Sequence, residues 1–308
     1  MDQCDLYITG SNSKMLSSDI LTSFRNRGDE IKVYPLSFSE YLTGYQGRED
    51  DAWRDYLYYG GMPYILTLDD PRDKAKYLEN LFKKTYITDI VERYNIKNVD
   101  DLEKIMDVLA SSVGSLINPT NISNTFKSKT GDSVSRNTVA EYINEIKESF
   151  LIDEAKRFDI RGREYISGQQ KYYFTDLGLR NCRLNFRQFD LPHLLENAVY
   201  NELIIRGYNV DVGRIDYRKR VGGVNTTVTL ETDFVVNRSS ERWYIQVAEG
   251  IDEPGKLEQE EASLLRIKDG FGKIILVNTD TPQHYTNNGI RIISILDFMC
   301  DRGCLEKL

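Results

Sequence analysis

The sequence predicts an α/β protein, an α+β multidomain chain in which helical segments precede a mixed sheet. Two patterns support this fold class. After residue 194, alternating apolar residues typical of strands are interleaved with stretches of helical spacing. Between residues 101 and 174, three stretches of helical spacing precede two strand-like stretches. At 308 residues the chain has room for two or three domains.

The composition is that of a globular protein, and it restricts the choice of function. A net charge of −8 argues against a cationic surface for nonspecific nucleic-acid binding, although a local basic patch is compatible with it. The four cysteines are scattered and, together with the two histidines, show no zinc spacing, so we expect neither a disulfide framework nor a structural metal. No apolar run has the length of a membrane span, and no signal peptide opens the chain. We therefore expect a soluble, cytoplasmic protein without a membrane partner.

The first 42 residues contain two predicted strands. Residues 5–12 are typical of a buried strand that ends in a turn, residues 14–24 of a helix, and Ile31–Leu36 of a second short strand. A strand so close to Met1 has few neighbours in the chain to satisfy its backbone groups. We therefore expect it to pair with another part of this chain or with a second copy, which makes it a candidate surface for a protein partner or a homo-oligomer.

Several strings carry a resemblance to a known family. They are Tyr-Ile-Thr-Gly-Ser-Asn-Ser-Lys-Met-Leu (7–16), Phe-Arg-Asn-Arg-Gly (24–28), Tyr-Pro-Leu-Ser-Phe-Ser-Glu-Tyr-Leu (34–42), Tyr-Gly-Gly-Met-Pro (59–63) and Lys-Tyr-Tyr-Phe-Thr-Asp-Leu-Gly-Leu-Arg (171–180). Together they resemble a family of prokaryotic AAA+ ATPases whose members carry a C-terminal domain of unknown function similar to restriction endonucleases. The resemblance covers nearly the whole chain.

The resemblance also draws attention to a missing nucleotide site. In that family a phosphate-binding loop and an acidic magnesium motif precede the Thr-Gly-Ser-Asn strand, but this chain has no G-x-x-x-x-G-K-[ST] sequence. Without that loop nucleotide phosphates have no adequate site, so we expect neither bound ATP nor ATP hydrolysis by this chain. The resemblance implies that residues 1–42 are an AAA+ C-terminal remnant. Asn12 would then be a sensor of the γ-phosphate and Arg27 a trans-acting arginine, or both are relics. As a further alternative, Met1 is not the natural start and an upstream segment supplies the ATPase core.

Residues 43–100 are predicted to be a helical connector. Thr43–Asp51 is a polar break, and the aromatic-rich helical turn Trp53–Tyr59 stops at a Gly-Gly pair. Residues 73–94 form a helix in this prediction, because apolar residues recur along one face.

Residues 101–184 are predicted to be a winged helix-turn-helix domain. The three helices are expected at Asp101–Gly114, Pro119–Lys127 and Ser135–Phe150, with Ser135 as the cap of the third. A hairpin follows, with strands at Leu151–Phe158 and Lys171–Phe174 and a turn at Asp159–Arg163. Asp176 is expected to cap the next helical turn.

A winged helix predicts a DNA-binding surface. The third helix would be the recognition helix, with Arg136 and Asn137 at its start, and the wing carries Arg157, Arg161 and Arg163, which could neutralise phosphates. Three glutamates on the same helix would repel a duplex if they faced it. Winged helices also serve as protein-contact modules, so both nucleic acid and protein remain candidate partners.

Residues 185–308 are predicted to form a domain with the order α-β-β-β-α-β. This order is the core of the PD-(D/E)xK nuclease fold, which includes restriction enzymes and junction resolvases. The elements are expected as a helix at 194–206, strands at 208–215, 226–236 and 242–248, a helix at 255–269, strands at 272–278 and 290–294, and a terminal helix.

Three segments of this domain could converge on one acidic site. Glu196 lies among apolar helix neighbours, where an unpaired carboxylate would be costly, while Glu231 and Asp233 share one face of a strand. In the resembling nucleases a helix Glu, a strand Asp and an acid on the next strand bind magnesium, so Glu196, Glu231 and Asp233 are candidate Mg²⁺ ligands. A lysine two residues after the third acid orients the attacking water in those enzymes.

This chain departs from the nuclease pattern at two positions. Gln246 replaces the third acid and Ala248 stands at the position of the lysine, although Gln246 could still offer a carbonyl oxygen and Lys256 could reach back from the next helix. Losing the lysine removes water activation and charge stabilisation. Two hypotheses follow. One is a protein that binds nucleic acid or a protein partner through a winged helix and a degenerate nuclease-like domain. The other is a Mg²⁺-dependent endonuclease that uses Glu196, Asp233 and Gln246.

Overall fold

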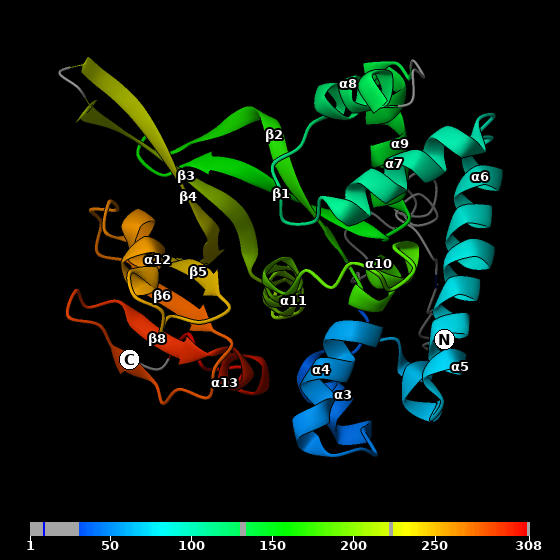
Figure 1. The fold of residues 1–308 in the computed structure, drawn as a ribbon, viewed down its shortest axis with the longest axis horizontal. Helices are drawn as coiled ribbons and strands as arrows, with labels where there is room; N and C mark the ends of the chain where they lie inside the picture. Colours follow the sequence, from blue (N-terminus) through cyan, green and yellow to red (C-terminus); the bar gives the residue numbers. More distant parts are fainter. Residues whose placement is uncertain (1–8, 10–30, 130–133, 222–223, 307–308) are drawn as a thin grey trace, which may run out of the picture.

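The protein has a mixed α/β fold built on one large sheet with helices around it (Figure 1). The computed structural model describes residues 9, 31–129, 134–221 and 224–306. Asn12, Arg27, the predicted helix at 14–24 and, apart from Thr9, the predicted strand at 5–12 lie outside these residues. None of the described helices combines the length and the apolar character that a membrane span requires.

The strand predicted at Ile31–Leu36 is wrong, because these residues form no strand and pair with none of the strands that the structure describes. Ile31 and Val33 are 80% and 89% exposed, so their alternation buries nothing. One backbone hydrogen bond, from the Leu36 N–H to the Gly61 carbonyl (2.8 Å), fixes the end of the segment. Ser37 then begins helix α3 (Phe38–Gly44) with a capping box to Glu40.

The helical connector follows the prediction closely. Helix α4 ends at the predicted Gly-Gly pair, and the predicted helix at 73–94 is confirmed as α5, a π-helical segment and α6. The helix starts two residues earlier than predicted, because Asp70 caps it and Pro71 is its first residue. The bounds are α4 Glu49–Tyr59, a 3₁₀ helix Pro63–Thr67, α5 Pro71–Asn80, the π-helical segment Leu81–Ile87 and α6 Thr88–Tyr94.

The three helices expected after residue 100 are present and share one apolar core. Ser135 caps α9 as predicted, since its Oγ accepts the Thr138 N–H (3.1 Å). Apolar side chains of all three helices pack with Tyr172 and Phe174 of the following hairpin. The bounds are α7 Val99–Ser111, α8 Pro119–Lys129 and α9 Arg136–Glu148.

The sheet is continuous from the predicted wing to the C-terminal strands, in the order β2-β1-β3-β4-β5-β6-β8-β7. The hairpin strand β1 pairs in parallel with β3, from Arg157 opposite Val212 to Asp159 opposite Arg214. Strand β2 begins at Glu164, seven residues before the predicted start. The bounds are β1 Ile152–Asp159, β2 Glu164–Phe174, β3 Asn209–Val221, β4 Val224–Arg238, β5 Glu241–Ala248, β6 Gly272–Val277, β7 His284–Tyr285 and β8 Arg291–Ser294.

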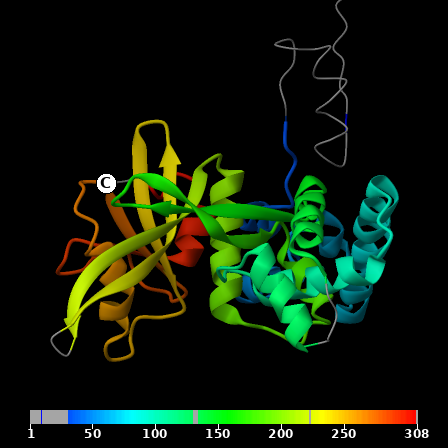
Figure 2. The same ribbon diagram turned by 90° about the horizontal axis from the view of Figure 1, so that it is seen from above.

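Helices cover both faces of the C-terminal strands. Side chains of α11 and α13 pack with Phe234 and Ile245 on one face, and Leu264 of α12 packs with Val235 and Tyr244 on the other. The order α-β-β-β-α-β is therefore confirmed from α11 to β6, although α12 ends five residues before the prediction. Strands β3 and β4 extend beyond the rest of the sheet as a long hairpin (Figures 1 and 2). The helix bounds are α10 Leu177–Arg183, α11 Leu191–Ile205, α12 Lys256–Leu264 and α13 Ile295–Cys300.

A buried carboxyl group joins two segments that lie 115 residues apart in the sequence. Asp176 caps α10 as predicted, because its Oδ1 accepts the Leu179 N–H (2.9 Å), while its Oδ2 accepts the N–H of Gly61 (2.7 Å). A Cβ on Gly60 would lie 2.3 Å from Asp176 Oδ1. The strings 59–63 and 171–180 therefore form one structural junction.

Stability should depend on pH through Asp176. Burial raises the pKa of this carboxyl to about 6 although the backbone N–H donors oppose the rise. Because the folded pKa exceeds the unfolded value, the group favours folding below about pH 4, and that contribution is lost as the pH rises through 6. We expect the stability of the wild type relative to Asp176→Asn to fall by about 2 kcal/mol from pH 4 to pH 7. Urea unfolding of both proteins at the two pH values measures this, and a pH-independent difference would contradict it.

Candidate functional site

The three predicted acids come together where β4 and β5 separate. Asp233 is at this point, and its Oδ2 accepts the backbone N–H of Val247 on β5 (2.9 Å). Glu231 is two residues before it on β4, and Glu196 is on the buried side of α11. We call Glu196, Glu231 and Asp233 the acid cluster.

A lysine from the hairpin stands at the centre of the acid cluster. Lys171 Nζ lies 2.8 Å from Glu196 Oε1, 2.7 Å from Glu231 Oε1 and 3.8 Å from Asp233 Oδ1. Its side chain is only 3% exposed. Tyr173, two residues further along β2, donates its hydroxyl to Glu196 Oε1 (2.5 Å). Strand β2 therefore contributes both a cation and a hydrogen-bond donor to a site that the sequence analysis built from other segments.

Burial and the neighbouring charges together set the protonation states of Lys171 and Asp233. Burial disfavours the charged form of Lys171, but attraction to Glu196, Asp233 and Glu231 outweighs it, so the pKa of Lys171 is raised and the group is an ammonium. Burial, helped by repulsion from Glu196, raises the pKa of Asp233 and favours its neutral form. The Lys171 ammonium thus offsets the negative charge of the two close carboxylates, and the raised pKa of Asp233 reduces the charge that remains.

This arrangement does not fit a magnesium ion. Mg²⁺ requires oxygen ligands in a compact octahedron, and the ammonium fills the space between the three acids. Glu196 Oε2 faces Gly114, where a Cβ would be only 3.0 Å away. Within the described residues, no group of three or more His, Cys, Asp or Glu side chains is arranged to hold a metal ion.

The other predicted catalytic residues make their contacts elsewhere. Gln246 Oε1 accepts from Ser263 Oγ on α12 (3.4 Å), and Lys256 pairs with Glu260 on the same helix (3.2 Å). Ala248 is buried in the core under α12. The lysine that reaches the acid cluster is thus Lys171 rather than Lys256. Only its place in the string 171–180 could have drawn attention to it.

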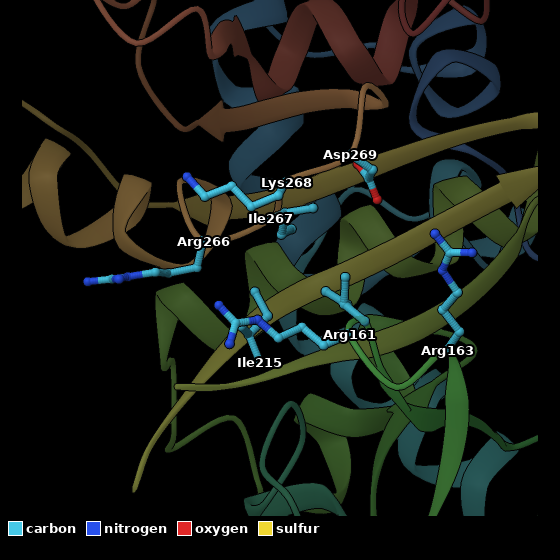
Figure 3. A pocket seen from close by; sticks show the side chains of 8 residues that line it. Arg161, Arg163, Ile215, Arg266, Ile267, Lys268 and Asp269 are labelled. Carbon is cyan, nitrogen blue, oxygen red and sulfur yellow. The ribbon is translucent and has the colours of Figure 1, made fainter. Parts of the chain in front are cut away.

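A second site is a cavity of about 320 Å³ with four cations at its rim (Figure 3). Arg161 and Arg163 come from the β1–β2 turn, and Arg266 and Lys268 from the segment between α12 and β6. All four side chains are exposed, and none takes part in the ion pairs found among the described residues. The other lining residues are Ile160, Ile215, Ile267 and Asp269. We call this site the basic pocket.

The turn of the predicted wing is fixed against β3. Asp159 Oδ1 accepts the N–H groups of Arg161 (2.9 Å) and Gly162 (3.0 Å), and the Ile160 N–H donates to the Arg214 carbonyl (3.0 Å). The Arg161 guanidinium also donates to the Asp216 carbonyl (2.9 Å). The sequence analysis found Arg161 and Arg163 but not Arg266 and Lys268, which lie about a hundred residues further along the chain.

The remaining predicted DNA-binding residues do not line this pocket. Arg136 and Asn137 are exposed at the start of α9. Arg157 is half-buried on β1, and burial followed by repulsion from Arg214 lowers its pKa. The five residues therefore fall into three separate places.

The basic pocket continues onto the extended β3–β4 hairpin. Between residues 217 and 230 the sequence contains Arg218, Lys219 and Arg220 and no Asp or Glu, and these three side chains are exposed. The Arg266 guanidinium lies 4.2 Å from the centre of the Tyr217 ring and so connects the pocket with the hairpin. We call residues 217–221 and 224–230 the basic arm; these parts of β3 and β4 extend outward in Figure 2.

Comparisons with known proteins give a family but no activity. Residues 1–42 match a family described as an AAA domain, and residues 50–190 match a domain of unknown function (DUF8612). An uncharacterised protein of Methanocaldococcus jannaschii is 28% identical over 277 residues, which are 86% of this chain and 60% of that protein. No solved structure matches the chain. An uncharacterised protein of Haemophilus influenzae is 35% identical over 303 residues, which are 96% of this chain and 70% of that protein. The first 42 residues are thus similar to an AAA domain, and this chain belongs to the family of the Haemophilus influenzae protein.

Proposed function

We propose that this chain binds nucleic acid through the basic pocket and the basic arm, and that its nuclease-like centre does not cleave. One observation carries the binding proposal: four exposed cations, which form no ion pair with any residue that the structure describes, converge on one cavity of a chain whose net charge is −8. Cations kept together in this way suit a phosphate backbone, since each phosphate contact releases bound counterions. The proposal includes no ATPase activity for this chain and no ATP or Mg²⁺ as cofactor.

The helical and sheet arrangement supports this proposal. Helices α7–α9 followed by the β1–β2 hairpin have the order of a winged helix, and α11 to β6 have the order of the PD-(D/E)xK core. In this proposal the winged helix contributes its wing turn, with Arg161 and Arg163, to the phosphate-binding surface. Arg136 and Asn137 remain a second candidate contact for nucleic acid or for a protein partner.

Lys171 supports the absence of cleavage. An ammonium between Glu196 and Glu231 satisfies the buried acids without a metal ion, so the centre contributes folding energy and specificity rather than chemistry. Ala248 provides neither proton transfer nor charge stabilisation at the position of the nuclease lysine.

Charge reversal in the basic pocket tests the binding proposal. In fluorescence anisotropy with a labelled oligonucleotide at low salt, Arg161→Glu/Arg163→Glu should raise the Kd by roughly 100-fold and reduce the slope of log K against log salt by about 2. The matched control is Arg72→Glu/Lys97→Glu, which reverses two exposed cations of the connector. Absence of binding by the wild type, or an equal loss in the control, would contradict the proposal.

A Mg²⁺-dependent endonuclease is the second candidate. The observation in its favour is that Lys171 brings to the acid cluster a lysine that β5 lacks. Incubation of the wild type and of Asp233→Ala with linear and branched DNA, in Mg²⁺ or Mn²⁺, separates the two candidates. We expect no cleavage by either protein; cleavage that Asp233→Ala abolishes would overturn the proposal of a silent centre.

A further inference from the structure

We propose that the basic pocket takes single-stranded rather than duplex nucleic acid, because exposed aromatic rings beside it form a ledge on which unpaired bases can stack. This inference rests on the proposed nucleic-acid binding and names its ligand class. The ledge consists of the side chains of Phe158, Tyr165 and Phe271 with Arg242 between them. We call it the aromatic ledge.

The rings of the aromatic ledge are contiguous; Tyr165 and Phe271 are exposed, and Phe158 is half-buried against the core. Tyr165 is 62% exposed and Phe271 is 41% exposed. The Arg242 guanidinium lies 5.5 Å from the ring centre of Phe158 and 5.4 Å from that of Phe271. Phe158 in turn meets Tyr165 edge to face at 5.5 Å.

The aromatic ledge joins the basic pocket on one side. Tyr165 follows Arg163 by two residues, and Phe271 follows Asp269 by two. Arg163 and Asp269 lie on the same side of the pocket in Figure 3, away from Arg266. Asp269 is fixed there, because its Oδ2 accepts the Tyr244 hydroxyl (2.5 Å) and its Oδ1 accepts the Phe271 N–H (3.3 Å). These two hydrogen bonds hold the Asp269 carboxylate and fix the backbone at Phe271, whose side chain is exposed.

A strand whose phosphates contact the pocket would place its bases at the ledge. A single strand can turn its bases outward, so they can stack on Tyr165 and Phe271 while Arg161 and Arg163 hold the backbone. In a duplex the base faces are already stacked on one another and cannot reach the rings. Ring faces beside a basic groove are the combination that single-strand-binding proteins use.

Substitution of the two exposed rings tests the contribution of the aromatic ledge to binding separately from that of the basic pocket. For a labelled single strand, Tyr165→Ala/Phe271→Ala should raise the Kd by at least roughly 10-fold, because two stacked bases lose their platforms. The affinity for a duplex of the same length should stay the same, and so should the salt dependence of single-strand binding. Tyr165→Leu/Phe271→Leu, which keeps apolar volume without a π face, should not restore binding. The matched control is Tyr64→Ala/Tyr285→Ala, which removes two rings that are 53% and 56% exposed elsewhere.

The outcomes distinguish this inference from the proposed function. Wild-type protein that binds duplex as tightly as single strand, with both depending on Arg161 and Arg163, would overturn the single-strand inference and leave nucleic-acid binding intact. Full binding by the leucine variant would also overturn it, since the ledge would then be an apolar contact surface. Wild-type protein that binds neither form would overturn the proposed function and the inference together.

Discussion

A Lys171→Met variant should lose about 3–5 kcal/mol of its free energy of unfolding at pH 7, because it leaves the buried Glu196 and Asp233 and the half-buried Glu231 without their cation. Methionine preserves the length and apolar stem of lysine, so the charge is the main change. The loss should be smaller at pH 5 than at pH 8, since the orphaned carboxyls can then take up protons and become neutral. Urea unfolding at the three pH values measures the effect.

Lys256→Met is the matched control for the Lys171 variant. Lys256 also pairs with a glutamate, but its side chain is 35% exposed and the pair lies within one helix, so its loss should cost less than about 1 kcal/mol. Equal costs for the two variants would mean that the buried ammonium is not what stabilises the acid cluster.

A divalent cation should partly rescue the Lys171→Met variant. With the ammonium gone, three carboxylates border a space that a cation can occupy, so Mn²⁺ at about five times its Kd would add about 1 kcal/mol to the variant and nothing to the wild type. Asp233→Asn in the same background should weaken the response. If Mn²⁺ stabilised the wild type equally, Lys171 would not be taking the place of a metal ion.

The sequence predicted those elements whose pattern is local. Helix α9 with its Ser135 cap and the order from α11 to β6 follow from periodicity and capping residues within short windows. The strand at Ile31–Leu36 failed because alternation indicates an extended segment but does not provide a neighbouring strand. Strand β2 was predicted too short, since residues 164–170 are mostly polar and largely exposed and carry little apolar alternation.

The candidate site depends on contacts that no local pattern encodes. Lys171 meets Glu196 across 25 residues and Glu231 across 60. This is possible because β2 pairs with β1, and β1 pairs in parallel with β3. Arg266 joins Arg161 at the basic pocket across a still longer stretch of about a hundred residues. Sequence reasoning brought the three acids together from the order of the elements, but the cation that neutralises them comes from a hairpin assigned to another domain.

The glycine of the Asp-Leu-Gly string should be the position at which the smallest substitution does the most damage. A Cβ on Gly178 would lie 2.0 Å from the carbonyl oxygen of Tyr59 and 3.0 Å from Leu78 Cδ1. The first contact is with backbone, so α10 would have to move away from α4. This would weaken the hydrogen bond from the Gly61 N–H to Asp176 and those from the Asn181 side chain to the last carbonyls of α4. We expect Gly178→Ala to destabilise the protein by at least about 3 kcal/mol.

Gly270→Ala is the control for this substitution, because a Cβ there meets no atom within 4 Å and the backbone does not require glycine. It should change the free energy of unfolding by less than about 0.5 kcal/mol. Urea unfolding of both variants compares them directly, and similar values would mean that α10 can shift freely against α4. A large difference in destabilisation between the two variants would give a physical reason why this chain carries both strings, 59–63 and 171–180. Each is one half of a backbone-to-backbone contact, and the second half also holds Lys171, seven residues before Gly178, in register with the acid cluster.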